Sequence, residues 1–303
     1  MKLGFVGLGA MGGALARRLM LSHRLRVYDL DAARVAEFAA EGAEPAASPA
    51  GLASECDLVM TCLPTSDHVR AALFGPDGIA AALPGGGIVA DMTSGDPNAT
   101  RAMAAEMTER GLTLLDAPVS GGPAGAAAGT IAIMVGADTD SYARIEPVFR
   151  AISPNLLHCG PVGTGHTMKL VNNMTAAGAL AITFETLAMG VKNGLDLDTM
   201  MRGLNMGSGR SFISEALLPR LLDGHFAANF QIGLLLKDVS LAARCGAASG
   251  APMPLGGLVA EIIRAAVQEH GYGADMNILV RSMERAAQAH IVPQNGPDQG
   301  DRR

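Results

Sequence analysis

The chain has 303 residues, of which 49% are hydrophobic and 17% charged, with no tryptophan and a formal net charge of -6. This composition excludes a disordered chain, and the negative charge argues against a nucleic-acid-binding protein, because the phosphate backbone attracts basic surfaces. The length predicts two domains with a break near the middle.

The N-terminus carries the pattern of a dinucleotide-binding unit. The apolar run from Lys2 to Val6 predicts a buried parallel strand, and it leads into an alanine-rich helix through the motif Gly7-Leu8-Gly9-Ala10-Met11-Gly12. In that context the first glycine permits the tight turn, the second lets a pyrophosphate approach the backbone, and the third lets the helix pack closely. Taken alone, the motif is also typical of a glycine-rich helix start. Because the early glycines interrupt the apolar run, the segment is not predicted to be a signal peptide.

The second predicted strand, Leu25 to Tyr28, ends in Asp29, which stands 22 residues after Gly7. An acid at this place accepts hydrogen bonds from the adenosine ribose. A second acid, Asp31, follows, and no arginine stands immediately beside Asp29 to meet a 2′-phosphate. The sequence therefore predicts NAD rather than NADP, although Arg34 is near enough along the chain to reach round.

Alternating strands and helices continue through the first half of the chain. Strands are predicted at 58–62, 88–92, 112–115, 131–135 and 155–158, with a helix at 140–150 between the last two. This alternation is typical of a parallel sheet, whose ligands bind beyond the carboxyl ends of the strands. Two strand ends lead into Leu63-Pro64-Thr65 and Thr93-Ser94, which offer backbone and hydroxyl groups to a cofactor but are also typical of ordinary turns and helix caps.

A third strand end leads into a serine followed by glycines, Ser120-Gly121-Gly122. Successive backbone N–H groups in such a stretch can bind an anion, which would suit a substrate carboxylate. A flexible glycine loop has the same composition, and the local sequence does not choose between the two.

The candidate catalytic centre is the stretch from Gly163 to Asn173. A run with no proline and almost no charge follows its glycines and predicts a buried helix, on which Lys169 and Asn173 lie one turn apart on the same face. A lysine in so apolar a helix needs a partner or must become neutral, because desolvating an ammonium is costly. The alternative is a lysine whose stem lies along the apolar face while its amine reaches water.

The second half is predicted to be all-helical, with helices near 168–192, 196–206, 211–222, 231–248, 254–270 and 275–289. We therefore expect an α/β Rossmann-type doubly wound sheet in residues 1–162, an all-α substrate and oligomerisation domain in 163–290, joined by a long inter-domain helix, and a disordered tail in 291–303. The alanine- and leucine-rich helices favour a homodimer or homotetramer. One charged pair interrupts this half, Lys237-Asp238. It is either an exposed helical pair or it brings a second amine, that of Lys237, to the site, where it would contact the nicotinamide or bind the substrate.

No metal site is predicted, because neither the seven histidines nor the four cysteines have ligand spacing. The cysteines, which have no paired spacing, indicate free thiols and a cytoplasmic location. We expect no membrane partner.

Taken together, the motifs resemble the 3-hydroxyisobutyrate dehydrogenase family of β-hydroxyacid dehydrogenases. The resemblance extends from Leu3 to about Arg285, and it rests on F-V-G-L-G-A-M-G (5–12), C-L-P-T-S (62–66), D-A-P-V-S-G-G (116–122), G-T-G-H-T-M-K-L-V-N-N (163–173), L-N-M-G-S-G-R-S (204–211) and L-L-K-D (235–238). It implies that Lys169 is catalytic and that Ser120, Gly121, Gly122 and Asn173 bind substrate. It also implies cofactor contacts at Leu63, Pro64, Ser94 and Lys237, and at His68, where the family often has another polar residue.

The expected reaction is the NAD-dependent oxidation of a short β-hydroxyacid to its semialdehyde, or the reverse, with 3-hydroxyisobutyrate as the first candidate because of the 204–211 stretch. Tartronate semialdehyde (2-hydroxy-3-oxopropionate) reduction and L-serine oxidation are the alternatives within the family. A 6-phosphogluconate-like enzyme would need more cationic phosphate ligands than Arg210 alone supplies. A sensor or scaffold that binds NAD without turnover would not need Lys169.

Overall fold

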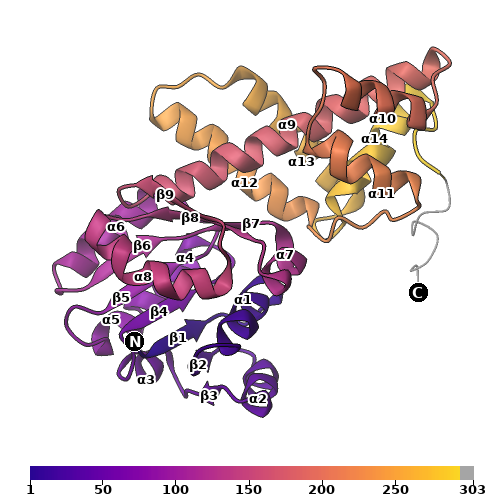
Figure 1. The fold of residues 1–303 in the computed structure, drawn as a ribbon. Helices are drawn as coiled ribbons and strands as arrows, with labels where there is room; N and C mark the ends of the chain where they lie inside the picture. Colours follow the sequence, from indigo (N-terminus) through magenta and orange to yellow (C-terminus); the bar gives the residue numbers. More distant parts are fainter. Residues whose placement is uncertain (294–303) are drawn as a thin grey trace. The chain divides into compact units, whose positions relative to one another are not determined.

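The structure is a computed structural model that describes residues 1–293. The chain forms two compact units, Met1–Lys169 and the chain from Leu170 onward. The boundary falls inside one long helix, α9 (Thr164–Lys192) (Figure 1).

The first unit is built on a nine-stranded sheet in the order β3-β2-β1-β4-β5-β6-β8-β7, with β9 paired to β8. Neighbours from β3 to β6 are parallel, whereas β8 is antiparallel to β6 and β7 and parallel to β9. The strands are β1 (Leu3–Val6), β2 (Leu25–Tyr28), β3 (Glu44–Pro45), β4 (Leu58–Thr61), β5 (Ile88–Asp91), β6 (Thr113–Asp116), β7 (Val119–Ser120), β8 (Ala132–Gly136) and β9 (Leu156–Gly160). The parallel part has the order expected of a dinucleotide-binding sheet.

Helices cover both faces of this sheet (Figure 1). They are α1 (Ala10–Met20), α2 (Ala32–Ala40), α3 (Pro49–Ala53), α4 (Ser66–Phe74), α5 (Ile79–Ala82), α6 (Pro97–Thr108), α7 (Gly122–Ala128) and α8 (Thr139–Ile152). Alternate side chains of β1, β4, β5 and β6 enter different cores: in β4, Leu58 and Met60 pack with α1 and α8, whereas Val59 packs with α3, α4 and α6. Each such buried side chain contributes about 1.5–3 kcal/mol, so both layers stabilise the sheet. The predicted doubly wound fold is confirmed.

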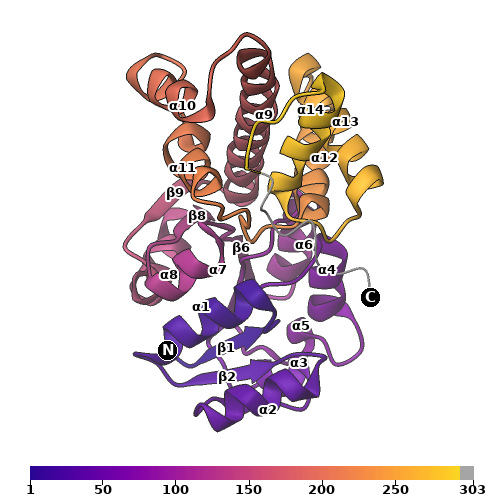
Figure 2. The ribbon, with the colours of Figure 1, turned by 90° about the vertical axis from the view of Figure 1, so that its right-hand side faces the viewer.

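The second unit is helical, as predicted. After α9 come α10 (Leu197–Met206), a π-helical turn η1 (Ile213–Leu217), α11 (Leu218–Leu222), α12 (Ile232–Ala248), α13 (Pro254–His270), a 3₁₀ turn η2 (Met276–Ile278) and α14 (Leu279–Ala287). Figure 2 shows α9 between α10 and α11 on one side and α12 to α14 on the other. Its side chains Leu180, Phe184 and Leu187 are buried in the helical core.

The length and composition of α9 alone would let it cross a membrane, and it is the one helix of residues 1–293 that meets this test. Half of its apolar 18-residue window is buried inside the structure. A core helix of a globular protein has the same composition, because it needs apolar residues on several faces.

Two short strands were not predicted. In β3 Pro45 stands on the edge of the sheet, where a missing N–H costs no ladder bond. In the predicted glycine loop, Val119–Ser120 forms β7 and the glycines begin α7. The predicted tail begins at residue 291, but Ile291 and Val292 are buried and donate their N–H groups to Glu284. The rest of that prediction, residues 294–303, lies outside the described residues.

Candidate active site

The glycine motif forms a turn that only small residues allow. Gly7 has a φ of +97°, and a Cβ on Gly12 would overlap the Gly7 carbonyl oxygen. Gly9 is the N-cap of α1 and has no side chain to satisfy the first N–H groups of that helix. These groups are therefore free of a side-chain cap and can meet an anion, as a pyrophosphate site requires. Leu8 is buried, whereas Ala10 and Met11, which begin α1, are exposed and half-buried.

Asp29 is fixed at the start of the glycine turn by two backbone hydrogen bonds. Its Oδ2 accepts from the Leu8 N–H at 2.6 Å, and its Oδ1 accepts from the Asp31 N–H at 2.8 Å. A carboxylate has about four acceptor positions, so capacity remains for ribose hydroxyls.

Arg34 lies closer to the glycine turn than its place in the sequence indicates. Its Nε is 3.3 Å from Asp31 Oδ2, and its Nη1 would be 3.5 Å from a Cβ on Gly9. The guanidinium of Arg34 therefore lies beside the glycine turn. It pairs with Asp31, one of the two acids on which the prediction of NAD rests.

The turns after β4 and β5 are tied together. The Leu63 N–H donates to Thr93 Oγ1 at 3.0 Å, and the Asp96 N–H donates to Ser66 Oγ at 2.8 Å. This pairing brings Leu63, Pro64 and Ser94 to one edge of the sheet, as the strand order predicts. His68 lies in the first turn of α4, exposed, with Nδ1 2.7 Å from the Thr65 hydroxyl that caps the helix.

Ser120, Gly121 and Gly122 connect β7 to α7. Gly121 and Gly122 have φ values of +134° and +70°, which explains why glycines occupy these two positions. Gly121 is the N-cap of α7 and Gly122 is its first residue. Ser120 is half-buried and Gly121 is exposed.

The start of α9 is held by a buried carboxylate that the sequence did not single out as functional. Asp116, at the end of β6, accepts the N–H of Gly163 with Oδ1 and the N–H of His166 with Oδ2, both at 2.6 Å. Burial raises the pKa of Asp116, although the imidazole of His166 and these two N–H groups act in the opposite direction. This side chain serves as the N-terminal cap of α9 from a distant strand.

Lys169 and Asn173 stand four residues apart on α9 and are 8% and 7% exposed. The prediction of a buried pair on one helix is confirmed, and the alternative of a lysine amine in open water is not what the structure has. Asn173 donates its Nδ2 to Asp238 Oδ2 at 2.6 Å and accepts from Asn172 Nδ2 at 3.0 Å.

Asp238 is the residue that the sequence interpretation undervalued. It is 2% exposed, so Lys237-Asp238 is not an exposed helical pair. Lys237 Nζ lies 3.2 Å from Asp238 Oδ1, within ion-pair distance but without hydrogen-bond alignment. This carboxylate offsets the charge of Lys237.

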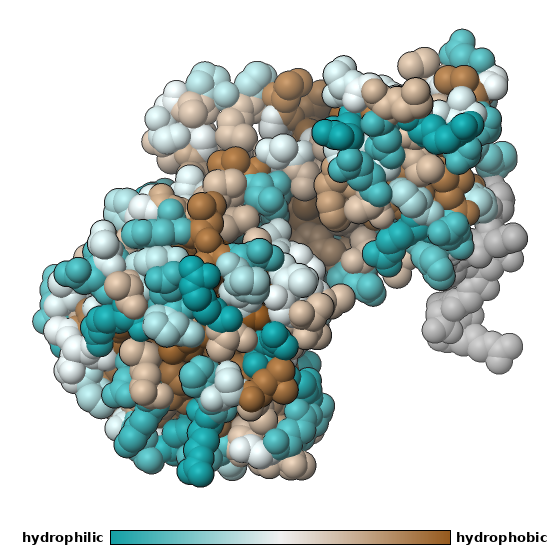
Figure 3. Space-filling view, in the orientation of Figure 1, coloured by the Kyte–Doolittle hydropathy of each residue, from teal (hydrophilic) through white to brown (hydrophobic). Residues whose placement is uncertain are grey.

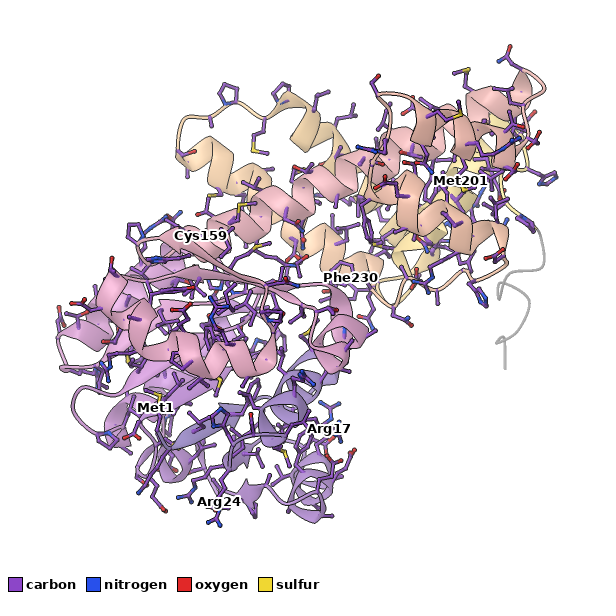
Figure 4. The ribbon with its side chains drawn as sticks, in the orientation of Figure 1. Met1, Arg17, Arg24, Cys159, Met201 and Phe230 are labelled. Carbon is purple, nitrogen blue, oxygen red and sulfur yellow. The ribbon has the colours of Figure 1, made fainter. Side chains whose placement is uncertain are left out.

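The four cysteines are free thiols. Burial raises the pKa of Cys56 to about 11, and it also raises the pKa of Cys159, labelled on β9 in Figure 4. Neither thiol is therefore activated as a nucleophile. Within residues 1–293 no three histidine, cysteine, aspartate or glutamate side chains are grouped to hold a metal ion.

Two family models together match most of the chain. The NAD-binding domain of 6-phosphogluconate dehydrogenase matches residues 2–160, and the NAD-binding domain of NADP-dependent 3-hydroxyisobutyrate dehydrogenase matches residues 163–283. The chain is 36% identical to the 2-(hydroxymethyl)glutarate dehydrogenase of Eubacterium barkeri over 288 residues, which cover 94% of this chain and 95% of the relative. It is also 36% identical to a 3-hydroxyisobutyrate dehydrogenase of Pseudomonas aeruginosa over 264 residues, covering 84% and 89%. The chain belongs to the 3-hydroxyisobutyrate dehydrogenase family of β-hydroxyacid dehydrogenases.

A solved structure supports this assignment. The 3-hydroxyisobutyrate dehydrogenase of Mycobacterium tuberculosis, solved with L-serine, has a TM-score of 0.88 and 29% identity, covering 93% of this chain and 98% of that one. As a β-hydroxyacid dehydrogenase, this chain is an oxidoreductase that acts on a CH–OH group with a nicotinamide cofactor.

Proposed function

We propose that this β-hydroxyacid dehydrogenase oxidises 3-hydroxyisobutyrate to its semialdehyde with NAD, or catalyses the reverse reduction. The names of the relatives support the class of substrate: 2-(hydroxymethyl)glutarate, 3-hydroxyisobutyrate and L-serine each carry a CH₂OH group on the carbon next to a carboxylate. They differ in the third group on that carbon, which is a propionate, a methyl or an amine. The shared chemistry is oxidation of the primary alcohol.

The charges near the 204–211 stretch favour the methyl-bearing substrate over one with a second carboxylate. Arg210 is the cationic residue of this stretch. Its side chain is exposed, and its Nε lies 3.4 Å from Glu215 Oε1. A guanidinium already paired with a carboxylate is a weak anchor for another. L-Serine and tartronate semialdehyde remain the competing substrates.

The observation that carries the proposal is the buried pair of Lys169 and Asn173, one turn apart on α9. In oxidation the Lys169 amine, when neutral, would take the proton of the substrate hydroxyl; in reduction its ammonium would stabilise the forming alkoxide. The backbone of Ser120, Gly121 and Gly122 would hold the substrate carboxylate. Both groups of the β-hydroxyacid would then be positioned by this chain.

Asn173 has one of its two N–H bonds committed to Asp238 and one acceptor position committed to Asn172. An amide can make about four hydrogen bonds, so a second N–H and a second lone pair can meet the substrate. The carboxylate of Asp238 would keep the amide from rotating by half a turn, since an oxygen facing it would be repelled. We infer that Asp238 orients Asn173 and keeps Lys237 close.

The residues of the glycine motif fit NAD. The φ of Gly7 and the close approach of Gly12 shape a turn that leaves space for a pyrophosphate, and Asp29 is fixed beside it. Gly7 to Gly12, Asp29, Leu63, Pro64, His68, Ser94 and Lys237 would hold the cofactor. NAD supplies the hydride acceptor when it is bound.

A screen of short β-hydroxyacids with NAD tests the proposed function. Formation of NADH is followed by absorbance with 3-hydroxyisobutyrate, L-serine, 2-(hydroxymethyl)glutarate and glycerate, and consumption of NADH is followed with tartronate semialdehyde. The highest kcat/KM is expected for 3-hydroxyisobutyrate. A clear preference for another compound would make that compound the substrate in place of 3-hydroxyisobutyrate. No turnover of any of them would refute the class of reaction for this chain.

We expect kcat/KM for NAD to exceed that for NADP by about tenfold or more, because Asp29 and Asp31 repel a 2′-phosphate. Asp29→Asn should narrow this ratio. Arg34→Ala is the matched variant: if Arg34 assists a 2′-phosphate, this change lowers kcat/KM for NADP alone. An NADP value in the wild-type enzyme equal to or above the NAD value would contradict the preference.

We propose that the chain is a cytoplasmic homodimer or homotetramer. Large apolar side chains are exposed along α9 and α13, namely Val171, Ile182, Met189, Leu255 and Leu258, and hydrophobic residues reach the surface of the helical unit in Figure 3. A second copy would cover such a surface, because exposed apolar patches mark association sites. A monomeric mass in sedimentation equilibrium at micromolar concentration would refute the proposed oligomer.

A further inference from the structure

His166 is a fully buried histidine to which neither the sequence motifs nor the proposed reaction assigns a role. It lies in the first turn of α9, three residues before Lys169. Two buried carboxylates flank it: its Nε2 is 3.9 Å from Asp91 Oδ2, and its Nδ1 is 3.9 Å from Asp116 Oδ2. A polar ring is costly to bury, so its partners indicate what it does there.

The two ring nitrogens bond to different elements. Nε2 lies 2.9 Å from the carbonyl oxygen of Thr93, and because a carbonyl can only accept, Nε2 carries a proton and donates it. Nδ1 lies 2.9 Å from the hydroxyl of Thr100 on α6. The edge of the ring also fills the space above Gly95, where a Cβ would come within 2.9 Å of Cε1.

The Thr93 end of this contact belongs to the turn that the proposed function gives to the cofactor. Thr93 accepts the N–H of Leu63 through its hydroxyl, and Ser94 follows it directly. At the other end, the backbone N–H of His166 is held by Asp116. The imidazole thus connects the turns of Leu63 and Ser94 to the first turn of the helix that carries Lys169.

We propose that His166 is a positioning residue, whose hydrogen bond from Nε2 to the Thr93 carbonyl sets the start of α9, and with it Lys169, relative to the cofactor-binding turns. This inference rests on the proposed function of Lys169. All the contacts involved lie within the first compact unit, Met1–Lys169. A shift of about 1 Å at a reacting group can cost about 100-fold in rate, so a single buried bond at the base of α9 is sufficient to matter.

Two substitutions of His166 separate the positioning role from a general effect on stability. One keeps the hydrogen bond that Nε2 makes, and the other keeps a polar group at the place of Nδ1. In His166→Gln the side-chain amide can still donate to Thr93, whereas in His166→Asn a shorter amide stands where Nδ1 was and loses that bond. We expect kcat to fall about 10- to 100-fold in His166→Asn and less than about threefold in His166→Gln, with the Kd of NAD within about threefold of wild type in both.

Thr100→Val is the structural control. It removes the partner of Nδ1 and leaves the Thr93 bond intact, so it should lower the melting temperature without lowering kcat more than about threefold. If Thr100→Val reduces kcat as much as His166→Asn does at equal loss of stability, the Thr93 bond has no special role and the proposal fails.

A second readout needs neither cofactor nor substrate. Hydrogen exchange of the peptide covering residues 163–175 should be faster than wild type in His166→Asn and unchanged in His166→Gln. Should His166→Asn fail to fold, Gly95→Ala is compared with Ser66→Ala, because its Cβ would come within 2.9 Å of Cε1 of the ring and 3.0 Å of Ser66 Oγ. Gly95→Ala should lower kcat as His166→Asn is expected to, and more than Ser66→Ala does; an equal fall in the two variants counts against the ring contact. Unchanged kcat and unchanged exchange in the variant that folds would overturn the inference.

Lys169→Ala, measured in parallel, separates this inference from the proposed function. Loss of turnover in Lys169→Ala together with wild-type kcat in a folded His166→Asn protein overturns the positioning role alone. Wild-type turnover in both variants overturns the proposed function, and the positioning role with it.

Discussion

Lys169→Ala should lower kcat by about 1,000-fold or more in both directions of the reaction, since positioned general acid–base groups contribute about 10²- to 10⁴-fold and this amine would also stabilise the alkoxide. The Kd of NAD should stay within about threefold, because the glycine turn lies at the start of α1, and Asp29, which follows β2, accepts a hydrogen bond from that turn. Stopped-flow measurements give kcat, and displacement of bound NADH by NAD, followed by the fluorescence of NADH, gives the Kd of NAD.

Lys169→Arg distinguishes proton transfer from charge alone. A guanidinium stays protonated at any working pH, so it cannot accept the hydroxyl proton and should lose most of the oxidation rate. Lys192→Ala, an exposed lysine in the last turn of the same helix, is the matched control and should leave kcat unchanged. Oxidation by the wild-type enzyme should quicken toward alkaline pH, because Lys169 must be neutral to act as a base. A Lys169→Ala enzyme with more than a tenth of wild-type kcat would refute the assignment.

Asp116→Ala should lower the free energy of unfolding by about 3 kcal/mol, because it leaves two buried N–H groups at the start of α9 without their acceptor. Asp138→Ala is a suitable comparison: Asp138 also caps a helix, α8, but it is exposed and accepts from Ser141, so about 1 kcal/mol is expected. Urea unfolding followed by circular dichroism measures both. Equal losses in the two variants would show that the burial of Asp116 adds nothing.

The contributions of Asp116 and Asp138 to the free energy of unfolding should also depend on pH in opposite senses. Burial raises the pKa of Asp116, so its contribution to stability is complete below the ordinary aspartate pKa of about 3.9 and is lost as the pH rises through its raised value. Hydrogen bonds from Ser141 lower the pKa of Asp138, so its contribution is present above about 3.9 and is lost as the pH falls. The stability advantage of wild type over Asp116→Asn should therefore shrink as the pH rises above about 3.9, whereas the advantage over Asp138→Asn should not.

Local patterns were sufficient for most of the fold. Buried parallel strands read as short apolar runs, and β1, β2, β4 and β5 lie within a residue of the predicted ranges. The long helix and its lysine followed from an apolar run without proline. The strands β3 and β7 were not predicted, because two-residue strands have no periodicity and depend on a neighbouring strand for their hydrogen bonds.

In the candidate site, too, local patterns identified some residues and missed others. Gly7, Gly12 and Asp29 could be found because their spacing expresses a local geometric requirement, and Lys169 and Asn173 because one helical turn brings them together. Asp116, His166 and Asp238 could not. Their partners stand 47 to 73 residues away along the chain, and no pattern in the sequence records such contacts.

By itself, then, the sequence determined a dinucleotide fold, a helical second half and a buried lysine on the helix between them, since each depends on interactions between residues close along the chain. Only the tertiary structure decided that Asp238 is buried against Asn173, that Arg34 stands beside the glycine turn, and that Asp116 and His166 hold the first turn of α9. The physical reason is that burial and the pairing of charges depend on which strands and helices become neighbours when the chain folds.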